Sequence, residues 1–528
     1  MGIYVNPGNR AFAEIADADY EDMTGLIQLI NQTIDKKNKL TCVSRPRRFG
    51  KSWAASMLAA YYDCACDSHD LFDKRKIARL KGYEEHLNQY HVVYLDISGF
   101  VSAAQREGTP LELIPSQIIQ ALDDELRPLT PEMPENSSLE SRMLQIAEES
   151  AGRRFIFIID EWDAMIRETS GNEDAQKRYL TLLRGWFKNK NFTPRAVAAA
   201  YMTGILPIKK DGTQSTISDF REFTMLYPGK FAKYTGFTEP TVKRLCRKNR
   251  MDFEQIKAWY DGYDLAGTGP IYNPYSVMSA MEEKNCRSFW GKTSAAEGLT
   301  DYIKMDFDGL QETVASLIAG STVEVNINGF QNDFERFKSR DDILTLLVHL
   351  GYLVYNAETG TVKIPNEEVM QEFQNFLAEE NIGEHWVKLI SRSRKLLQDT
   401  LEGREEAVAA ALEEIRGENY APQYYNHEQA LRAIIKYAYL AAFGRYIKVE
   451  EMTSGKGIAD VVFLPASLSR LPAMVIELKW NKTSGGAIEQ IKQKNYTANL
   501  SLYEGNLLLV GINYDAKSGQ HTCEIEKG

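Results

Sequence analysis

A glycine, a lysine and a hydroxyl residue follow a short apolar run near the N-terminus, a combination that can bind phosphate. The run KLTCVS (39–44) leads into RPRRFGKS (45–52), and a helical pattern follows. In the Walker A pattern G-x-x-x-x-G-K-[ST], Gly50 lets the backbone N–H groups face phosphate, Lys51 reaches the β- and γ-phosphates, and Ser52 offers its hydroxyl to Mg²⁺. The segment fits this pattern except at its first position, which is an arginine. The sequence therefore predicts a site for a nucleoside triphosphate with Mg²⁺.

Four more polar or loop residues belong to this predicted site, with alternatives that the sequence leaves open. Arg47 and Arg48 lie inside the loop beside Phe49, and they either balance phosphate charge or form a basic surface patch. A later apolar run, AVAAAYMTG (196–204), places Thr203 near its end. That threonine either senses the γ-phosphate or is structural.

A second apolar run ends in acidic residues, as in a Walker B element. The run RRFIFIID (153–160) ends at Asp160 and is followed by Glu161. An aspartate at the end of a strand is by itself an ordinary helix N-cap. In a phosphate-binding core, however, Asp160 would hold Mg²⁺ and Glu161 would polarise the attacking water. Together with the loop about 110 residues earlier, this run predicts ATP binding and makes hydrolysis an expectation.

Two carboxylates and a lysine near the C-terminus form a second pattern with chemical potential. Asp460 lies in GIADVVF (457–463), while Glu477 and Lys479 lie in VIELKW (475–480). Residues two apart on a strand share a face, so Glu477 and Lys479 point the same way. If the two strands pair as a hairpin, Asp460 comes alongside them. Two converging carboxylates bind Mg²⁺ or Mn²⁺, which can stabilise a pentavalent phosphate while the lysine orients the nucleophile.

Other residues could complete this second site. Glu428, on a preceding helix, could supply a further carboxylate to the metal, and Gln490 and Tyr496 could contact the site or a phosphate. The alternative is that the Glu-x-Lys pair is a solvated ion pair on an edge strand. The order helix, strand, strand, helix favours a PD-(D/E)XK nuclease core, which cleaves phosphodiester bonds of nucleic acid.

The elements that must position these residues are α/β. Apolar strands at 39–44, 91–98, 153–160 and 196–204 alternate with helical patterns, which indicates a parallel sheet covered on both faces. The chain thus begins with a P-loop NTPase core. The pattern at 341–366 is a helix followed by two short strands, which fits either a winged helix or a generic helix-hairpin module.

Composition limits the ways in which the chain can meet nucleic acid. Lys and Arg total 62 against 73 Asp and Glu among 528 residues, a net charge of −11. A protein with this net charge is not expected to coat nucleic acid through its overall charge. Local basic clusters such as 243–250 and 492–494 would have to contact the phosphates; the alternative is that they are solvated helix faces. We see neither a signal peptide nor an apolar run of about 20 residues, so we expect a cytoplasmic protein with no membrane segment.

These motifs resemble a bacterial family with an N-terminal AAA-ATPase-like domain and a C-terminal PD-(D/E)XK nuclease superfamily domain. The resemblance is carried by RPRRFGKS (45–52), FIIDE (157–161), MTG (202–204), GFTE (236–239), WYDGY (259–263) and YNP (272–274). It implies that ATP and Mg²⁺ are held by Lys51, Ser52, Asp160 and Glu161, and that the nuclease triad is Asp460, Glu477 and Lys479. Two positions depart from the family pattern: Met23 replaces a common lysine, and the stretch before Asp460 lacks a common arginine.

We therefore predict four segments and a coupled activity. The segments are an AAA-ATPase-like P-loop domain (1–238), a helical extension (239–335), a winged-helix and linker region (336–405) and a restriction-endonuclease-like α/β domain (406–528). The expected function is ATP binding and hydrolysis coupled to metal-dependent cleavage of nucleic acid, with DNA as the expected substrate and defence against foreign DNA as the role. The alternative is an ATP-driven switch that assembles as a homo-oligomer, with a C-terminal domain that binds nucleic acid or a partner without cleaving.

Overall fold

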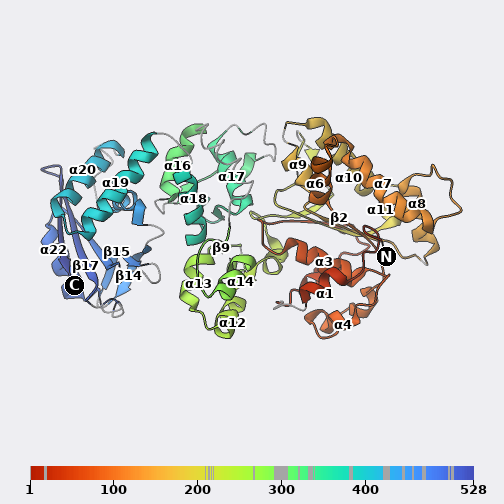
Figure 1. Ribbon diagram of the computed structural model, residues 1–528, viewed down its shortest axis with the longest axis horizontal. Coiled ribbons are helices and arrows are strands. Elements are labelled where there is room, and N and C mark those ends of the chain that lie inside the picture. The colour runs from red at the N-terminus through yellow and green to blue at the C-terminus, as the bar shows by residue number, and fades with distance from the viewer. Residues whose placement is uncertain are drawn as a thin grey trace. The chain divides into compact units, whose positions relative to one another are not determined.

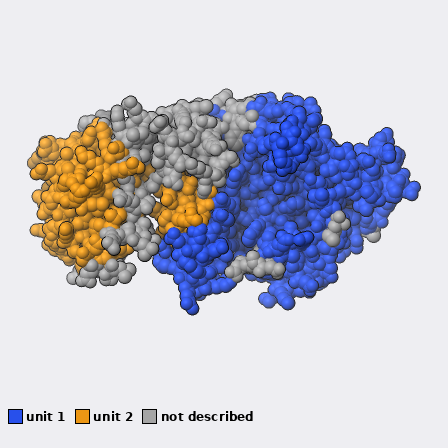
Figure 2. Space-filling model, viewed as in Figure 1, with its two compact units in different colours: residues 1–256, 261–285, 324–362 blue, residues 257–260, 286–323, 363–528 orange. Residues whose placement is uncertain are grey.

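A computed structural model of the chain contains two compact units, coloured separately in Figure 2. One unit comprises residues 1–256, 261–285 and 324–362, and the other comprises 257–260, 286–323 and 363–528. We call them unit 1 and unit 2. The structure describes all residues except 1, 17–20, 151, 170, 209, 212–213, 216, 218, 266–267, 291–306, 319–321, 331–336, 338, 380–383, 420–427, 443–445, 455–456, 466–470, 498–499, 501–502 and 504.

Unit 1 is built on a parallel sheet, as the alternating pattern predicts. Its strands, in spatial order, are β2 (His91–Asp96), β3 (Phe155–Asp160), β4 (Val197–Gly204), β1 (Leu40–Ser44) and β7 (Arg221–Phe223). Every residue of β1, β3 and β4 is buried, which explains their continuous apolar character. The second strand is shorter than predicted, because Asp96 caps helix α6 through the backbone N–H groups of Ser98 and Gly99.

Helices cover both faces of this sheet (Figure 1). On β3, Ile156 and Ile158 pack in one core and Phe157 and Ile159 in the other, because successive side chains point to opposite faces. The first core includes residues of α1 (Arg10–Ala16), α2 (Gly25–Asn31) and α3 (Lys51–Tyr62). The second includes residues of α6 (Ile97–Glu107), α7 (Ile114–Leu126), α8 (Leu139–Glu149) and α10 (Glu173–Phe187). Shorter helices are α4 (His69–Phe72), α5 (Tyr83–His86), α9 (Ala164–Glu168) and α11 (Thr193–Ala196), with a strand pair β5 (Lys210–Asp211) and β6 (Gln214–Ser215).

Two small sheets with their helices follow along the chain, and most of their residues belong to unit 1. One sheet has the order β8 (Phe237–Thr238), β10 (Pro270–Tyr272), β9 (Tyr263–Asp264), and the other β11 (Val323–Glu324), β13 (Thr361–Lys363), β12 (Val354–Asn356). The helices are α12 (Glu239–Asn249), α14 (Pro274–Glu283) and α17 (Arg340–Leu350), while α13 (Phe253–Tyr260) runs across the boundary of the units. The expected helix and two strands at 341–366 are therefore present as α17, β12 and β13; that they form a winged helix stays a prediction.

Unit 2 ends in a mixed five-stranded sheet between helices. Its strands, in spatial order, are β14 (Tyr446–Ser454), β15 (Gly457–Pro465), β16 (Ala473–Trp480), β17 (Leu507–Asp515) and β18 (Gln520–Lys527). Strands β16 and β17 are parallel and the other neighbours are antiparallel. One core of the sheet includes residues of α19 (Glu384–Leu401), α20 (Glu405–Asn419) and α21 (Glu428–Ala438), and the other includes residues of α22 (Ser484–Lys494). Helices α16 (Leu310–Ile318) and α18 (Glu367–Glu379) precede them. Within the described part of the chain, no helix is both long and apolar enough to cross a membrane.

Candidate nucleotide and metal sites

The predicted phosphate-binding loop joins β1 to α3 and has two residues in left-handed conformations. Gly50, the N-cap of α3, has φ +80°, which glycine adopts without steric cost. Arg48 has φ +69°, where a side chain is strained. Lys51 is buried at the start of α3 and donates a hydrogen bond to the carbonyl oxygen of Pro46 at 3.0 Å. The lysine is thus already directed along the inside of the loop.

The order of the sheet brings the second motif to this loop. Strand β4 lies between β1 and β3, so Thr203 on β4 lies next to the end of β3. Its hydroxyl donates a short hydrogen bond to Asp160. Burial raises the pKa of Asp160, and hydrogen bonds with Ser52 and Thr203 act in the opposite direction. A serine hydroxyl beside a buried carboxylate is the donor set that Mg²⁺ takes in a nucleotide site, so the residues present fit that ion.

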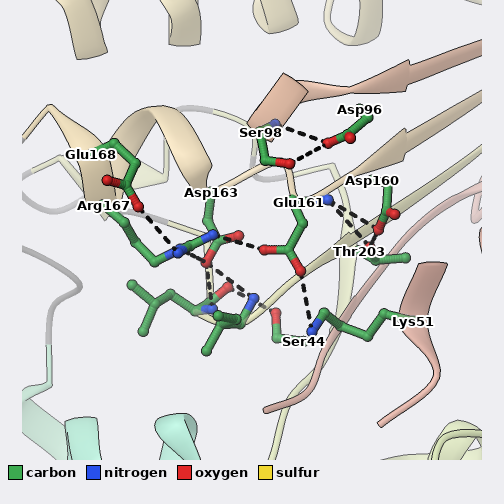
Figure 3. A network of polar contacts seen from close by, with 12 residues as sticks. Ser44, Lys51, Asp96, Ser98, Asp160, Glu161, Asp163, Arg167, Glu168 and Thr203 are labelled. Atoms are coloured by element: carbon green, nitrogen blue, oxygen red, sulfur yellow. Dashed lines mark hydrogen bonds and ion pairs between the residues drawn. The ribbon is translucent and has the colours of Figure 1, made fainter. Parts of the chain in front are cut away.

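Glu161 is held between two cations, as Figure 3 shows. Its carboxylate is 3.3 Å from Lys51 Nζ and 2.7 Å from Arg167 Nη2. Burial would raise the pKa of Glu161, but the charges of Lys51 and Arg167 lower it overall. Glu161 also has φ +49°, a strained conformation that aims its side chain at the loop. In the structure, the predicted water-polarising carboxylate is therefore paired with the predicted phosphate-binding lysine.

Two residues of this network were not predicted from the sequence. Arg167 on α9 pairs with Asp163 Oδ2 at 3.2 Å as well as with Glu161. Asp163 is fully buried and accepts hydrogen bonds from the backbone N–H groups of Ile205 and Leu206, at 3.0 and 2.9 Å. The four-residue spacing of Asp163 and Arg167 on a helix was the available signal.

The loop also contains two buried side chains that attach it to other segments of unit 1. Arg45, at the position of the missing first glycine, is fully buried and donates to Thr235 Oγ1 at 2.9 Å and to the carbonyl oxygen of Phe223 at 2.9 Å. Phe49 is 1% exposed and packs edge-to-face on Tyr263, with 5.2 Å between ring centroids. The side chain of Phe49 is therefore part of the core, and its predicted role in binding the nucleotide would fall to its backbone N–H group.

A cavity of about 830 Å³ opens at the loop. Its lining includes the predicted residues Arg47, Arg48, Gly50, Lys51, Ser52 and Glu161, together with Arg167. A concave site of this size is in the range that holds a nucleotide.

In unit 2, the structure brings together the carboxylates and the lysine of the second motif. Strands β15 and β16 pair antiparallel, with Val461 opposite Ile476. Lys479 Nζ lies 2.9 Å from Glu477 Oε1. Asp460, Glu477 and Lys479 are 8%, 2% and 8% exposed. Strand β16 lies in the middle of its sheet, so the alternative of a solvated ion pair on an edge strand is excluded.

The surroundings of Glu477 and Asp460 fit a cation. Gln490 on α22 donates to Glu477 Oε1 and, at 3.0 Å, to the hydroxyl of Tyr496. Glu477 Oε2 is buried and has no hydrogen-bond partner among the described residues. Burial and the neighbouring Asp460 raise the pKa of Glu477 to about 7. A buried carboxylate with a free oxygen, next to a second carboxylate, has the donors that a divalent ion requires.

Arg432 on α21 is a further residue that sequence reasoning missed. It pairs with Asp460 at 2.5 Å and so brings a positive charge to the same carboxylates. The side chain of Glu428, one turn earlier on this helix and predicted as a metal ligand, lies outside the described residues. Its role stays a prediction.

Comparison with known proteins identifies two parts of the chain. Residues 8–214 match the family model described as predicted AAA-ATPase, and residues 427–524 match that of the PD-(D/E)XK nuclease superfamily. The chain joins an AAA-ATPase-like domain to a PD-(D/E)XK nuclease superfamily domain. The resemblance found in the motifs is thereby confirmed. A bacterial relative, described as an uncharacterized protein in the vnfD 5′ region of Azotobacter chroococcum mcd 1, is 22% identical over 97% of this chain and 96% of its own.

The solved structures similar to this chain are distant in sequence. The Walker-type ATPase PABY2304 of Pyrococcus abyssi is 13% identical, with a TM-score of 0.32, and the match covers 67% of this chain and 94% of that one. The ORC2 protein of Aeropyrum pernix, in ADPNP–ADP complexes, is 10% identical, with a TM-score of 0.30, and the match covers 69% of this chain and 96% of that one.

Proposed function

We propose that this protein binds and hydrolyses ATP in unit 1 and uses this activity to control a metal-dependent nuclease site in unit 2. The observation that supports it best is the assembly of both predicted constellations around buried carboxylates. Glu161 lies among cations that suit a triphosphate, and Glu477 has a buried oxygen with no hydrogen-bond partner in the described part of the chain. Burying charged groups is costly, so such arrangements are retained where chemistry uses them.

In the nucleotide site, the residues divide the work by position. The backbone of the loop and Lys51 would hold the β- and γ-phosphates, and Ser52 with Asp160 would hold Mg²⁺, which screens the phosphate charge. Because Lys51 pairs with Glu161 in the structure, triphosphate must compete with Glu161 for the lysine. Glu161, released from Lys51, is then able to accept a proton from the attacking water.

In the nuclease site, Asp460 and Glu477 would hold Mg²⁺ or Mn²⁺. When bound, the ion would lower the pKa of a bound water and stabilise the negative charge that develops on the phosphate. Lys479, already beside Glu477, would orient the nucleophile. Gln490 fixes the orientation of Glu477 by donating to the oxygen that also faces Lys479. The substrate we propose is nucleic acid, with DNA first, and the role is defence against foreign DNA.

Two experiments test the halves separately. In ATP turnover, Lys51→Ala should lose binding, whereas Glu161→Gln should still bind ATP and lose hydrolysis by at least about 100-fold, the usual scale for a catalytic base. In titration calorimetry with Mn²⁺, wild-type protein should bind in unit 2 and Glu477→Ala should lose that binding. ATP hydrolysis unchanged in Glu161→Gln, or Mn²⁺ binding unchanged in Glu477→Ala, would contradict the corresponding half.

The alternative function is an ATP-driven switch whose unit 2 binds nucleic acid or a partner without cleaving. The observation in its favour is that Arg45 replaces the first glycine of the loop and fixes the loop to Thr235 and to the strand that contains Phe223. Light scattering would show an ATP-dependent change in mass, with assembly of several copies and no turnover. A mass independent of ATP would count against the switch.

A further inference from the structure

The cavity at the phosphate-binding loop has a side that the phosphates do not explain. In the sheet, β3 with Glu161 lies on one side of β1, and β7 lies on the other. The segment after β7 is tied to the loop on that other side, since Arg45 donates to Thr235 and a Cβ on Gly236 would lie 3.4 Å from the Phe49 ring. The cavity thus extends from the loop away from Glu161, toward residues 234–237.

One face of α14 lines this second side. Tyr275, Met278 and Glu282 all line the cavity, at a spacing that puts them on one face of the helix. The side chain of Asn273 accepts hydrogen bonds from the backbone N–H groups of Tyr275 and Ser276, at 3.0 and 3.4 Å, and so fixes the first turn. Tyr275 is 48% exposed. Tyr275 therefore leaves much of its ring accessible on the wall of the cavity.

The strained loop arginine is directed at this ring. Arg48 has φ +69°, and its guanidinium carbon lies 4.3 Å from the centroid of the Tyr275 ring. A non-glycine residue holds such a conformation only where its surroundings impose it. These two planar groups, with Met278 about one turn further along the same face of α14, offer a surface on which a flat aromatic ligand can stack.

The charges on this side indicate which part of a ligand belongs here. Among the described residues, the lining includes the carboxylates of Glu21 and, on α14, Glu282, and Glu21 is paired with Arg244. Carboxylates repel phosphate but accept hydrogen bonds from an amino group. We propose that Tyr275 and Met278, with Arg48, form the subsite for the base of the nucleotide, and that a purine with an exocyclic amino group is preferred because Glu282 accepts from it.

The inference rests on the proposed binding of triphosphate, so its test uses one ligand with a base and one without. Binding of ATP and of inorganic tripolyphosphate would be measured by calorimetry for wild type, Tyr275→Ala and Tyr275→Phe. Stacking of one base is worth about 1–3 kcal/mol, so Tyr275→Ala should weaken ATP by about 10-fold, within a range of about 5- to 150-fold, and leave tripolyphosphate unchanged. Tyr275→Phe, which keeps the ring, should bind ATP as the wild type does.

Control variants separate a subsite from a general disturbance. Tyr227 is also in unit 1 and 65% exposed, and it does not line the cavity, so Tyr227→Ala should bind both ligands normally. Inosine triphosphate, which lacks the amino group, should bind more weakly than ATP, and Glu282→Ala should remove the difference.

The outcomes distinguish this inference from the proposed function. Equal weakening of ATP and tripolyphosphate by Tyr275→Ala, or no weakening of either, would overturn the base subsite while leaving phosphate binding in place. Equal affinity of wild type for ATP and inosine triphosphate would overturn the amino-group preference. If wild type binds neither ATP nor tripolyphosphate, the proposed function fails and the subsite falls with it.

Discussion

Replacing Arg167 by methionine should destabilise unit 1, because the arginine compensates a carboxylate that is buried in the core. Arg167 is 12% exposed and pairs with Glu161 and with Asp163, whose side chain is fully buried. Methionine keeps the apolar stem and removes the charge. Among the described residues, Asp163 would then keep the backbone N–H groups of Ile205 and Leu206 as its hydrogen-bond donors, with no positive charge paired to it. Breaking a buried pair from one side costs about 3–5 kcal/mol, and we expect a loss of unfolding free energy of about 3 kcal/mol.

A matched arginine on the neighbouring helix provides the control. Arg178 also follows an aspartate, Asp174, by four residues and pairs with it at 2.9 Å, but the two side chains are 58% and 64% exposed. Exposed helix pairs contribute about 0.3–0.5 kcal/mol, so Arg178→Met should change little. The unfolding free energy of unit 1 would be measured by hydrogen exchange at increasing urea concentrations, followed in peptides from β3 and β4, which belong to unit 1. Equal and small effects of the two substitutions would refute the reasoning from burial.

Two further predictions concern the interior of unit 1. Burial and the nearby Arg45 lower the pKa of His349 to about 3; the unfolded chain therefore takes up a proton near pH 6.5 that the folded chain does not. The unfolding free energy should therefore fall by about 2 kcal/mol between pH 7 and pH 5. In urea titrations at the two pH values, the His349→Leu variant should lack this part of the loss. A Cβ on Gly204 would lie 2.6 Å from Asp163 Oδ1, so Gly204→Ala should cost about 1–3 kcal/mol in thermal unfolding. Gly185 lies on α10, and a Cβ added there would meet no atom within 4 Å. Gly185→Ala should therefore be neutral or stabilise the protein by up to about 1 kcal/mol. An equal loss of stability in both variants would contradict the close approach at Gly204.

The sequence was sufficient for features that depend on local pattern. Continuous apolar runs predict buried parallel strands, and β1, β3 and β4 are buried throughout. The spacing of Glu477 and Lys479 predicts a shared face, and the two side chains are in contact. Such features follow from the period of a strand and from the chemistry of adjacent residues.

Features that depend on contacts between distant segments could not be read in the same way. Arg45 looks like a loop cation in the sequence, yet it is buried because Thr235 and Phe223, far along the chain, offer it acceptors. Arg167 gains its role from a carboxylate that the end of β4 holds in place. Arg432 likewise meets Asp460 only through the packing of α21 on the sheet. The partners of Arg45 and Arg432 lie far away in the sequence, so only the fold reveals them, whereas the four-residue spacing of Asp163 and Arg167 was a weak local signal.

The central claim is that ATP bound in unit 1 controls metal-dependent cleavage by unit 2. It is tested most directly by the cleavage of labelled single- and double-stranded DNA and RNA with Mn²⁺ or Mg²⁺, with and without ATP, by wild type, Lys51→Ala and Glu477→Ala. We expect wild type to cleave DNA, Glu477→Ala to lose cleavage under every condition, and Lys51→Ala to lose the response to ATP while its metal site remains. Cleavage that persists in Glu477→Ala, or the absence of cleavage by wild type under every condition, would contradict the account.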